Sequence, residues 1–211
     1  MSPFKNVKNI RERFDYRKIL ELIPDNSKVL DLGCGTGDLL HLLKNDKKAI
    51  VKGVEISDNG IIECLSKGIP VEKMDMESGL GNYNNNAFDY VILSQTLQVI
   101  KNTDLLISEM LRAGKVGIIS FPNFGYWKIR LYLLLNGSMP KTRSIPFDWY
   151  NTPNIHLFTT KDFNTYCKIH NIKILEGLNF NVDHKGNAKT VTYHPNWFAQ
   201  FSLFVITAKS Q

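Results

Sequence analysis

The sequence predicts a doubly wound α/β fold built on a seven-stranded, mostly parallel sheet. Short apolar segments alternate with amphipathic segments of about ten residues as far as residue 121, which is typical of strands joined by helices. The apolar segments are nearly continuous hydrophobic runs, as expected of parallel strands that are buried on both faces. The last two apolar segments fit an antiparallel hairpin that completes the sheet.

The first half of the chain supplies most of these elements. Residues 12–23 have the apolar spacing of an amphipathic helix, which Pro24 ends. Residues 28–32 form the first predicted strand and lead through a glycine-rich turn into a helix over 38–45. The following elements are a strand over 50–56, a helix from Ser57 or Asp58 to about Gly68, strands over 71–74 and 88–93, a helix over 104–112 and a strand over 115–121.

The second half has a different composition. Residues 122–158 are rich in proline and aromatic residues, and we expect them to form a small inserted cap over the active-site crevice, with one helix over 127–135. Thr159 and Asp162 resemble a weak capping box at the start of a helix that reaches about residue 170. The final hairpin would use strands over 172–178 and 202–208. We expect residues 1–211 to form one domain.

Composition excludes several classes of protein. The net charge is +6, but the 26 Lys and Arg residues are spread along the chain, so we expect an ordinary basic surface and no nucleic-acid partner. The apolar runs are shorter than the roughly 18 residues that a membrane span needs. Three cysteines at long spacings predict neither a disulfide framework nor a metal site. We therefore expect a cytoplasmic protein without a membrane association.

The glycine-rich turn indicates a nucleotide-type ligand. Asp31-Leu-Gly-Cys-Gly-Thr-Gly37 follows a strand and precedes a helix, where backbone N–H groups can approach a ligand closely. Glu55 lies 18 residues beyond Gly37 at the end of the second strand, where its carboxylate could accept both hydroxyls of a ribose. The G-x-G-x-G spacing differs from the dinucleotide fingerprint, so hydride transfer fits less well. The alternative is a tight turn beside a solvated Glu.

The segment Val29–Gly37 resembles the first motif of class I S-adenosylmethionine-dependent methyltransferases, which have a Rossmann-like fold. That resemblance implies S-adenosylmethionine or S-adenosylhomocysteine as the cofactor. The three glycines of the loop would then pass close to the methionyl part. Asp31 would orient the loop and the ammonium group, and Glu55 would hold the ribose hydroxyls.

The resemblance also implies an adenine site after the next strand. Asp75 would accept from the exocyclic amine, Met76 would donate its backbone N–H to the ring, and Ile56 would pack on it. The residues expected to bind cofactor are Asp31, Gly33, Gly35, Gly37, Glu55, Ile56, Asp75, Met76, Ser94 and Gln95.

Longer segments narrow the resemblance to one family. Residues 93–98, 120–131, 139–142 and 149–157, together with the glycine motif, resemble the MetW family of methionine biosynthesis proteins over residues 12–207. This implies a methyltransferase-like partner or activator of homoserine O-acetyltransferase, with homo-oligomers possible. The alternative is an active methyltransferase on an unknown small molecule. Nucleic-acid methylation fits less well, because no Asn/Asp-Pro-Pro-Tyr/Phe motif is present.

A methyl acceptor would lie over the carboxyl ends of the strands. His156 is the plausible general base, since an unperturbed histidine titrates near pH 6.5, and we name His156 and Tyr126 as the catalytic candidates. The alternative for His156 is a structural role that fixes the cap to the sheet. The full set of candidate lining residues is Gln95, Gln98, Asn123, Tyr126, Tyr150, Asn154 and His156.

Overall fold

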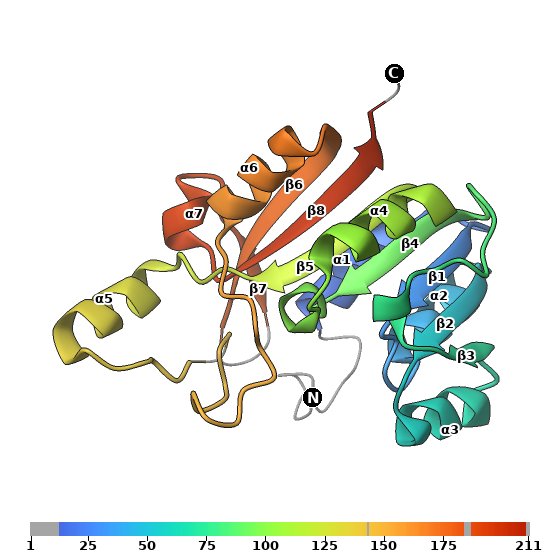
Figure 1. The fold of residues 1–211 in the computed structure, drawn as a ribbon, viewed down its shortest axis with the longest axis horizontal. Coiled ribbons are helices and arrows are strands. Elements are labelled where there is room, and N and C mark those ends of the chain that lie inside the picture. Colours follow the sequence, from blue (N-terminus) through green and yellow to red (C-terminus); the bar gives the residue numbers. More distant parts are fainter. Residues whose placement is uncertain (1–12, 143, 184–186, 210–211) are drawn as a thin grey trace.

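An eight-stranded sheet in the order β3-β2-β1-β4-β5-β8-β6-β7 forms the centre of the molecule (Figure 1). The computed structural model describes residues 13–142, 144–183 and 187–209. The strands are β1 (Lys28–Leu32), β2 (Ile50–Glu55), β3 (Val71–Lys73), β4 (Phe88–Ser94), β5 (Gly114–Pro122), β6 (Ile172–Val182), β7 (Ala188–Thr190) and β8 (Phe201–Ala208). β1 to β5 are parallel, and β8, β6 and β7 add to β5 in antiparallel pairs.

The predicted doubly wound, mostly parallel sheet with antiparallel final strands is confirmed, but the predicted number of seven strands is one too low. The extra strand is β7, three residues that pair with the end of β6. Its sequence, Ala-Lys-Thr, has no hydrophobic run from which a strand could be recognised. β6 also continues to Val182 instead of ending at Leu178, because its second half pairs with β8 and β7.

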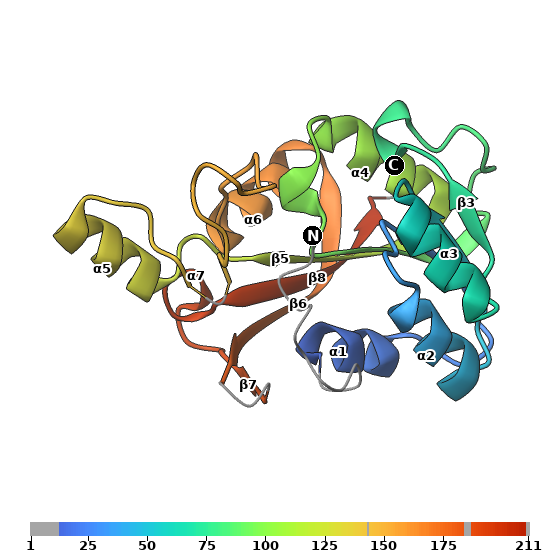
Figure 2. The same cartoon turned by 90° about the horizontal axis from the view of Figure 1, so that it is seen from below.

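Helices cover both faces of the sheet (Figure 2). They are α1 (Phe14–Leu22), α2 (Asp38–Asp46), α3 (Asp58–Ser66), α4 (Thr103–Ala113), α5 (Trp127–Asn136), α6 (Thr160–Ile169) and α7 (Pro195–Phe198), with short 3₁₀ helices η2 (Met76–Ser78) and η3 (Leu97–Val99). α1 and α2 lie on one face and α4 and α6 on the other. Residue 12, the expected first residue of the first helix, lies outside the described residues.

The two faces carry separate hydrophobic cores. On one face, Ile19 of α1 and Leu40 of α2 pack with Ile118 of the sheet. On the other, Leu106 of α4 and Phe163 of α6 belong to a second cluster of buried side chains. Burial of such a side chain contributes about 1.5–3 kcal/mol, so the helices are held by these two cores.

The start of α6 follows the predicted capping box. The Thr159 side chain accepts the Asp162 backbone N–H, and the Asp162 carboxylate accepts the backbone N–H of Thr159 at 2.9 Å. This reciprocal pair satisfies two N–H groups that a helix start otherwise leaves without partners.

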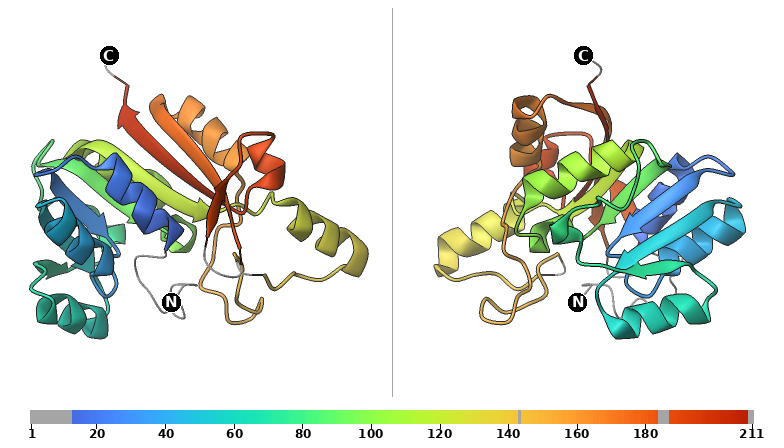
Figure 3. Two further views of the ribbon diagram at one scale, coloured as in Figure 1. Left: turned by 180° about the vertical axis from the view of Figure 1, so that it is seen from behind. Right: turned by 45° about the vertical axis from the view of Figure 1, so that its right-hand side comes forward.

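The segment after β5 leaves the body of the protein. α5 projects from the end of β5, away from the sheet, as Figures 1 and 3 show. The assignment of residues 122–158 to a cap, and of residues 1–211 to one domain, stays a prediction. In the part of the chain that is described, every helix is too short or too polar to traverse a lipid bilayer.

Candidate ligand-binding site

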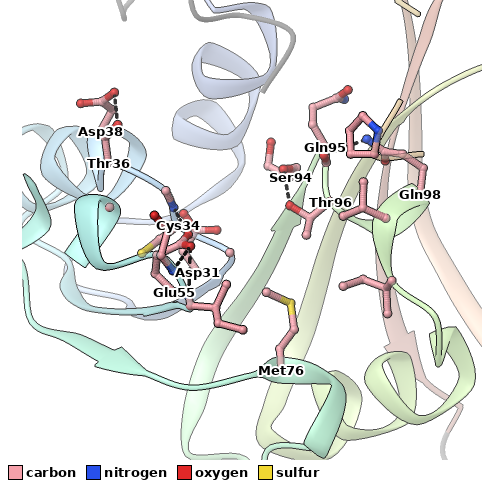
Figure 4. A pocket seen from close by; sticks show the side chains of 18 of the residues that line it. Asp31, Cys34, Thr36, Asp38, Glu55, Met76, Ser94, Gln95, Thr96 and Gln98 are labelled. Atoms are coloured by element: carbon pink, nitrogen blue, oxygen red, sulfur yellow. Dashed lines mark hydrogen bonds between the residues drawn. The ribbon is translucent and has the colours of Figure 1, made fainter. Parts of the chain in front are cut away.

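A cavity of about 980 Å³ opens at the carboxyl ends of the parallel strands. The loops that follow β1, β2, β3 and β4 all contribute to its lining, because parallel neighbours end at the same edge of a sheet. In Figure 4, Asp31, Cys34 and Glu55 form one side of the cavity. Gln95 and Gln98 lie on the opposite side.

The glycine loop is anchored to β2. The backbone N–H groups of Gly33 and Cys34 both donate to the Val54 carbonyl, at 2.9 and 3.0 Å. The loop has to reverse direction between β1 and α2, and Gly33 and Gly37 do so with φ of +70° and +72°. These are left-handed conformations that glycine adopts without steric cost, which explains the residue type at both positions.

Glu55 is held rigidly at the end of β2. Its Oε1 accepts the backbone N–H groups of Ile56 and Ser57, at 3.0 and 2.9 Å. Its Oε2 accepts the N–H of Gly35 at 2.8 Å. An ionised carboxylate has about four acceptor positions, so Oε2 retains capacity for a hydroxyl donated by a ligand. The position of the carboxylate is therefore set by the backbone before a ligand binds.

Asp31 lies at the bottom of the cavity and is 4 % exposed. Among the described residues, no hydrogen bond is made to its carboxylate. Burial raises the pKa of Asp31 to about 8; the nearby Arg13 guanidinium opposes this shift, while the carboxylates of Asp15 and Glu55 add to it. A cation in the cavity would favour the ionised form of this carboxylate.

α1 supplies a polar cluster that the sequence analysis missed. The Arg13 guanidinium donates through Nε and Nη2 to the two carboxylate oxygens of Asp15, at 3.1 and 2.6 Å, and through Nη1 to the Tyr16 hydroxyl at 2.7 Å. Asp15 is fully buried and also accepts from the Ser94 hydroxyl at 2.7 Å. An acid in the first turn of a helix is common, so the residue type gave no signal of this role.

Two of the expected adenine residues, Asp75 and Met76, follow β3, and the third, Ile56, follows β2. Asp75 is the N-cap of η2 and accepts the Glu77 backbone N–H at 3.0 Å. Met76 is buried, whereas the Ile56 side chain on the neighbouring loop is 57 % exposed. All three expected adenine residues line the cavity, with Met76 below the glycine loop in Figure 4.

The structure brings most of the expected cofactor residues together. Gly37 does not line the cavity and forms the start of α2. Gln98 and Asn154, two of the acceptor candidates, also line it. The cofactor candidates that line the cavity are Asp31, Gly33, Gly35, Glu55, Ile56, Asp75, Met76, Ser94 and Gln95.

The side chains of the two catalytic candidates are not part of the lining of this cavity. The His156 side chain is exposed, although its backbone N–H donates to the Gln98 carbonyl at 3.1 Å. Tyr126 is buried in a small cluster with Ile129 and Ile145. Neither side chain lines the cavity.

Two other acceptor candidates also lie outside the lining. Asn123 is fully buried, and its side chain donates to the Ala199 carbonyl at 2.8 Å and accepts the Gly125 N–H at 3.0 Å, a structural role. Tyr150 is 72 % exposed. The polar and aromatic composition of this segment could not distinguish exposed or structural side chains from those that line the cavity.

Solved structures with this fold include several methyltransferases. A SAM-dependent methyltransferase from Thermotoga maritima, described as a possible histamine N-methyltransferase, superposes with a TM-score of 0.67 at 18 % identity over 94 % of this chain and 91 % of that one. Magnesium protoporphyrin IX methyltransferase from Synechocystis, with bound SAH, gives 0.65 at 16 % identity over 97 % and 86 %. At these identities, the likeness establishes the class I methyltransferase fold.

Sequence relatives establish the family. A bifunctional methionine biosynthesis protein MetXA/MetW from Rhodopirellula baltica is 38 % identical over 178 residues, which are 80 % of this chain and 29 % of that protein. This chain therefore corresponds to less than a third of the relative's length. The family model for methionine biosynthesis protein MetW matches residues 13–206. The chain belongs to the MetW family of methionine biosynthesis proteins.

Proposed function

We propose that this protein binds S-adenosylmethionine or S-adenosylhomocysteine in the cavity at the strand ends. The observation that carries the proposal is the position of Glu55, fixed by three backbone N–H groups beside the glycine loop with acceptor capacity left on Oε2. In this proposal Glu55 holds the ribose hydroxyls. Asp31 receives the ammonium group, Asp75 and Met76 bind adenine, and Ser94 and Gln95 border the methionyl part.

The charge of the cavity supports a cationic ligand. The chain has a net charge of +6, yet among the described residues only two cationic side chains, Arg13 and Lys67, line the cavity. Lys67 is paired with Asp38, and Arg13 with Asp15. Such a lining attracts a sulfonium and an ammonium group. The acidic side chains that line the cavity are Asp31, Asp38, Glu55, Glu63, Asp75 and Glu77.

Calorimetric titration with S-adenosylhomocysteine tests this ligand directly. We expect one site per chain, with no heat of binding for NAD at the same concentrations. Bound ligand should raise the free energy of unfolding by about 2.7 kcal/mol at a hundredfold excess over Kd. Absence of binding by both S-adenosyl compounds would refute the proposal.

We further propose that the protein acts in methionine biosynthesis as a partner or activator of homoserine O-acetyltransferase. The Rhodopirellula relative, whose name joins MetXA and MetW in one bifunctional protein, supports this association. α5 supports it physically, because Leu134 and Leu135 on this projecting helix are 80 % and 72 % exposed. Large exposed apolar side chains on one element are typical of a protein-binding surface.

A matched pair of variants tests this partnership. Leu134→Ser with Leu135→Ser should weaken co-purification with the acyltransferase and reduce its activation. Ile62→Ser with Leu65→Ser removes two apolar side chains of α3 that are 64 % and 60 % exposed. This second variant should change neither the co-purification nor the activation of the acyltransferase. An acyltransferase rate that does not respond to saturating wild-type protein, with or without S-adenosylmethionine, would exclude the role.

A second candidate function is methyl transfer to a small molecule. Its support is the extension of the cavity beyond the expected cofactor residues, to Gln98, Phe147 and Asn154. An acceptor held there would need only to be aligned with the methyl group of a bound cofactor. Labelled S-adenosylmethionine and a metabolite extract should then yield a methylated product and S-adenosylhomocysteine in equal amounts. If no extract supports turnover, methyl transfer is excluded and ligand binding remains as the proposed function of the cavity.

A further inference from the structure

Two buried amide oxygens of residues that line the cavity have no hydrogen-bond partner in the described part of the chain. Oε1 of Gln95 and Oε1 of Gln98 are both without a donor among the described residues. The two residues are only 8 % and 4 % exposed, and both line the cavity. Buried polar atoms are nearly always hydrogen-bonded, because an unpaired acceptor loses its interaction with water without compensation. Both oxygens therefore retain the capacity to accept a hydrogen bond from a ligand.

The orientation of the Gln98 amide is fixed by its neighbour. Its Nε2 donates to the backbone carbonyl of Gln95 at 2.8 Å. A carbonyl can only accept, so the NH₂ group must face it. The free atom of Gln98 is therefore the oxygen.

The orientation of the Gln95 amide is fixed by a chain of hydroxyl groups. Ser94 donates its proton to the Asp15 carboxylate, at 2.7 Å. Ser120 lies 3.1 Å from the Ser94 hydroxyl and must therefore donate to it. The Ser120 oxygen is left as an acceptor, and Gln95 reaches it with Nε2 at 3.2 Å. The free atom of Gln95 is again the oxygen.

Gln95 borders the methionyl end of the proposed cofactor site and Gln98 lies beyond it, so the pair is apart from the proposed ribose and adenine sites. In Figure 4, Gln95 and Gln98 are on the wall opposite Asp31 and Glu55. Phe147 also lines the cavity. The volume of about 980 Å³ is at the upper end of the range for drug-sized ligand sites, so there is room for a second small molecule beside a nucleoside.

We propose that Gln95 and Gln98 form a binding site for the primary ammonium group of a small molecule, which occupies the cavity together with the cofactor. An ammonium group has three N–H donors, enough for both oxygens, and its charge suits the acidic lining. The inference rests on the proposed function in one respect: S-adenosylmethionine or S-adenosylhomocysteine occupies the wall that carries Asp31 and Glu55. It names amines as the class of second ligand.

Three related probes test the proposal on protein loaded with S-adenosylhomocysteine. Ethanolamine carries an ammonium group and a hydroxyl, choline keeps the charge but has no N–H, and ethylene glycol has hydroxyls without charge. Titrations followed by the side-chain amide resonances of glutamine should give a Kd for ethanolamine at least tenfold below those of the other two. Equal Kd values for ethanolamine and choline would mean that water satisfies the amide oxygens, and would overturn the proposal.

Variants locate the probe. Gln98→Met keeps the length of the side chain but removes the amide, and should weaken ethanolamine binding at least tenfold while the affinity for S-adenosylhomocysteine changes less than twofold. Thr96→Val is the control, because the Thr96 hydroxyl already donates to the Ser94 carbonyl at 2.9 Å. Thermal unfolding of each variant verifies that it is folded. Unchanged ethanolamine binding in Gln98→Met would refute the site.

The same titrations separate this inference from the proposed function. Loss of ethanolamine binding when S-adenosylhomocysteine is added would assign the two oxygens to the cofactor's own ammonium group, and would overturn the inference alone. Failure of S-adenosylhomocysteine to bind, with ethanolamine still bound in preference to choline, would overturn the proposed function alone.

Discussion

The carboxylate of Glu55 accepts the backbone N–H of Gly35 at 2.8 Å, which joins the end of β2 to the glycine loop. The same carboxylate closes the turn after β2 through Ile56 and Ser57. One side chain thus fixes the relative position of two backbone segments that border the cavity. A site organised in this way needs little rearrangement when its ligand binds, so less binding energy is lost to ordering.

Replacement of Glu55 tests this arrangement. In Glu55→Gln one acceptor oxygen becomes a donor and the charge is lost, and a hydrogen bond to a charged group contributes about 1.5–3 kcal/mol. We expect the affinity for S-adenosylhomocysteine to fall by about 10- to 150-fold, measured by calorimetry. Glu63→Gln is the control, since its side chain also lines the cavity but is 56 % exposed. Equal losses in the two variants would argue against a specific role for Glu55.

Gly60 explains why α3 can lie so close to the glycine loop. A Cβ at this position would approach the Gly35 carbonyl oxygen to 2.8 Å and Glu55 Cγ to 3.0 Å. Within a helix, Ala is usually about 1 kcal/mol more favourable than Gly. Here the contact reverses that preference, because neither the loop backbone nor the fixed Glu55 can move away freely.

We therefore predict that Gly60→Ala lowers the free energy of unfolding by about 1–2 kcal/mol, the usual cost of overpacking. It should also weaken binding of S-adenosylhomocysteine, because the loop is displaced. The control is Gly81→Ala, where an added Cβ would meet no atom within 4 Å. Urea denaturation and calorimetry measure both effects. A stabilised Gly60→Ala variant would contradict the packing described here.

Sequence patterns predicted the elements that carry strong apolar or glycine signals. The parallel strands, the glycine loop and the acids at the strand ends follow from periodicity and from residues with narrow conformational roles, such as Gly33 and Glu55. β7 was missed because three polar residues at a sheet edge leave no such signal. Strand pairing there depends on the partner β6, which local sequence does not reveal.

The side chains of the cavity were harder to predict wherever burial decides their role. The residue types of Arg13 and Asp15, at the start of a helix, gave no indication that Asp15 is fully buried. His156 was chosen for its chemistry, but its side chain is exposed. Exposure is set by tertiary packing, so residue type alone could not place these three side chains inside or outside the cavity.

The edge of the sheet contains a stabilising ion pair whose effect should depend on pH. Glu72 of β3 pairs with Lys52 of β2 at 2.8 Å and accepts from the Tyr83 hydroxyl at 2.8 Å. The hydrogen bond from Lys52, followed by that from Tyr83, lowers the pKa of Glu72 to about 2. A depressed pKa means that the ionised carboxylate stabilises the fold above pH 4.5, and that this contribution is lost as the pH falls toward 2.

We predict that Glu72→Gln lowers the free energy of unfolding by about 1–2 kcal/mol at pH 7, after allowance for solvent screening of a partly exposed pair. The difference between the variant and the wild type should shrink as the pH falls from 4.5 to 2. Guanidinium denaturation at pH 7 and pH 2.5 measures both values. A difference that is the same at the two pH values would show that charge is not its cause.

Asp31 should make ligand binding dependent on pH in the neutral range. Burial raises the pKa of Asp31 to about 8, so below that pH the free protein carries a proton on this carboxylate. A raised pKa also means that the folded state binds a proton that the unfolded state has released. Stability from this group therefore decreases as the pH rises from about 4 to 8. A cationic ligand makes the ionised form of Asp31 the favoured one, because it stabilises the negative charge of the carboxylate.

Binding of S-adenosylmethionine should consequently release a proton, and its affinity should rise as the pH increases from 6 to 8 and level off above 8. Calorimetry in two buffers of different ionisation enthalpy measures the proton released at pH 7. Asp31→Asn should bind more weakly and lose the dependence on pH, because the amide cannot ionise. Glu63→Gln again provides the control and should retain the wild-type slope. An affinity that is constant from pH 6 to 8 in the wild type would place the cationic groups of the ligand away from Asp31.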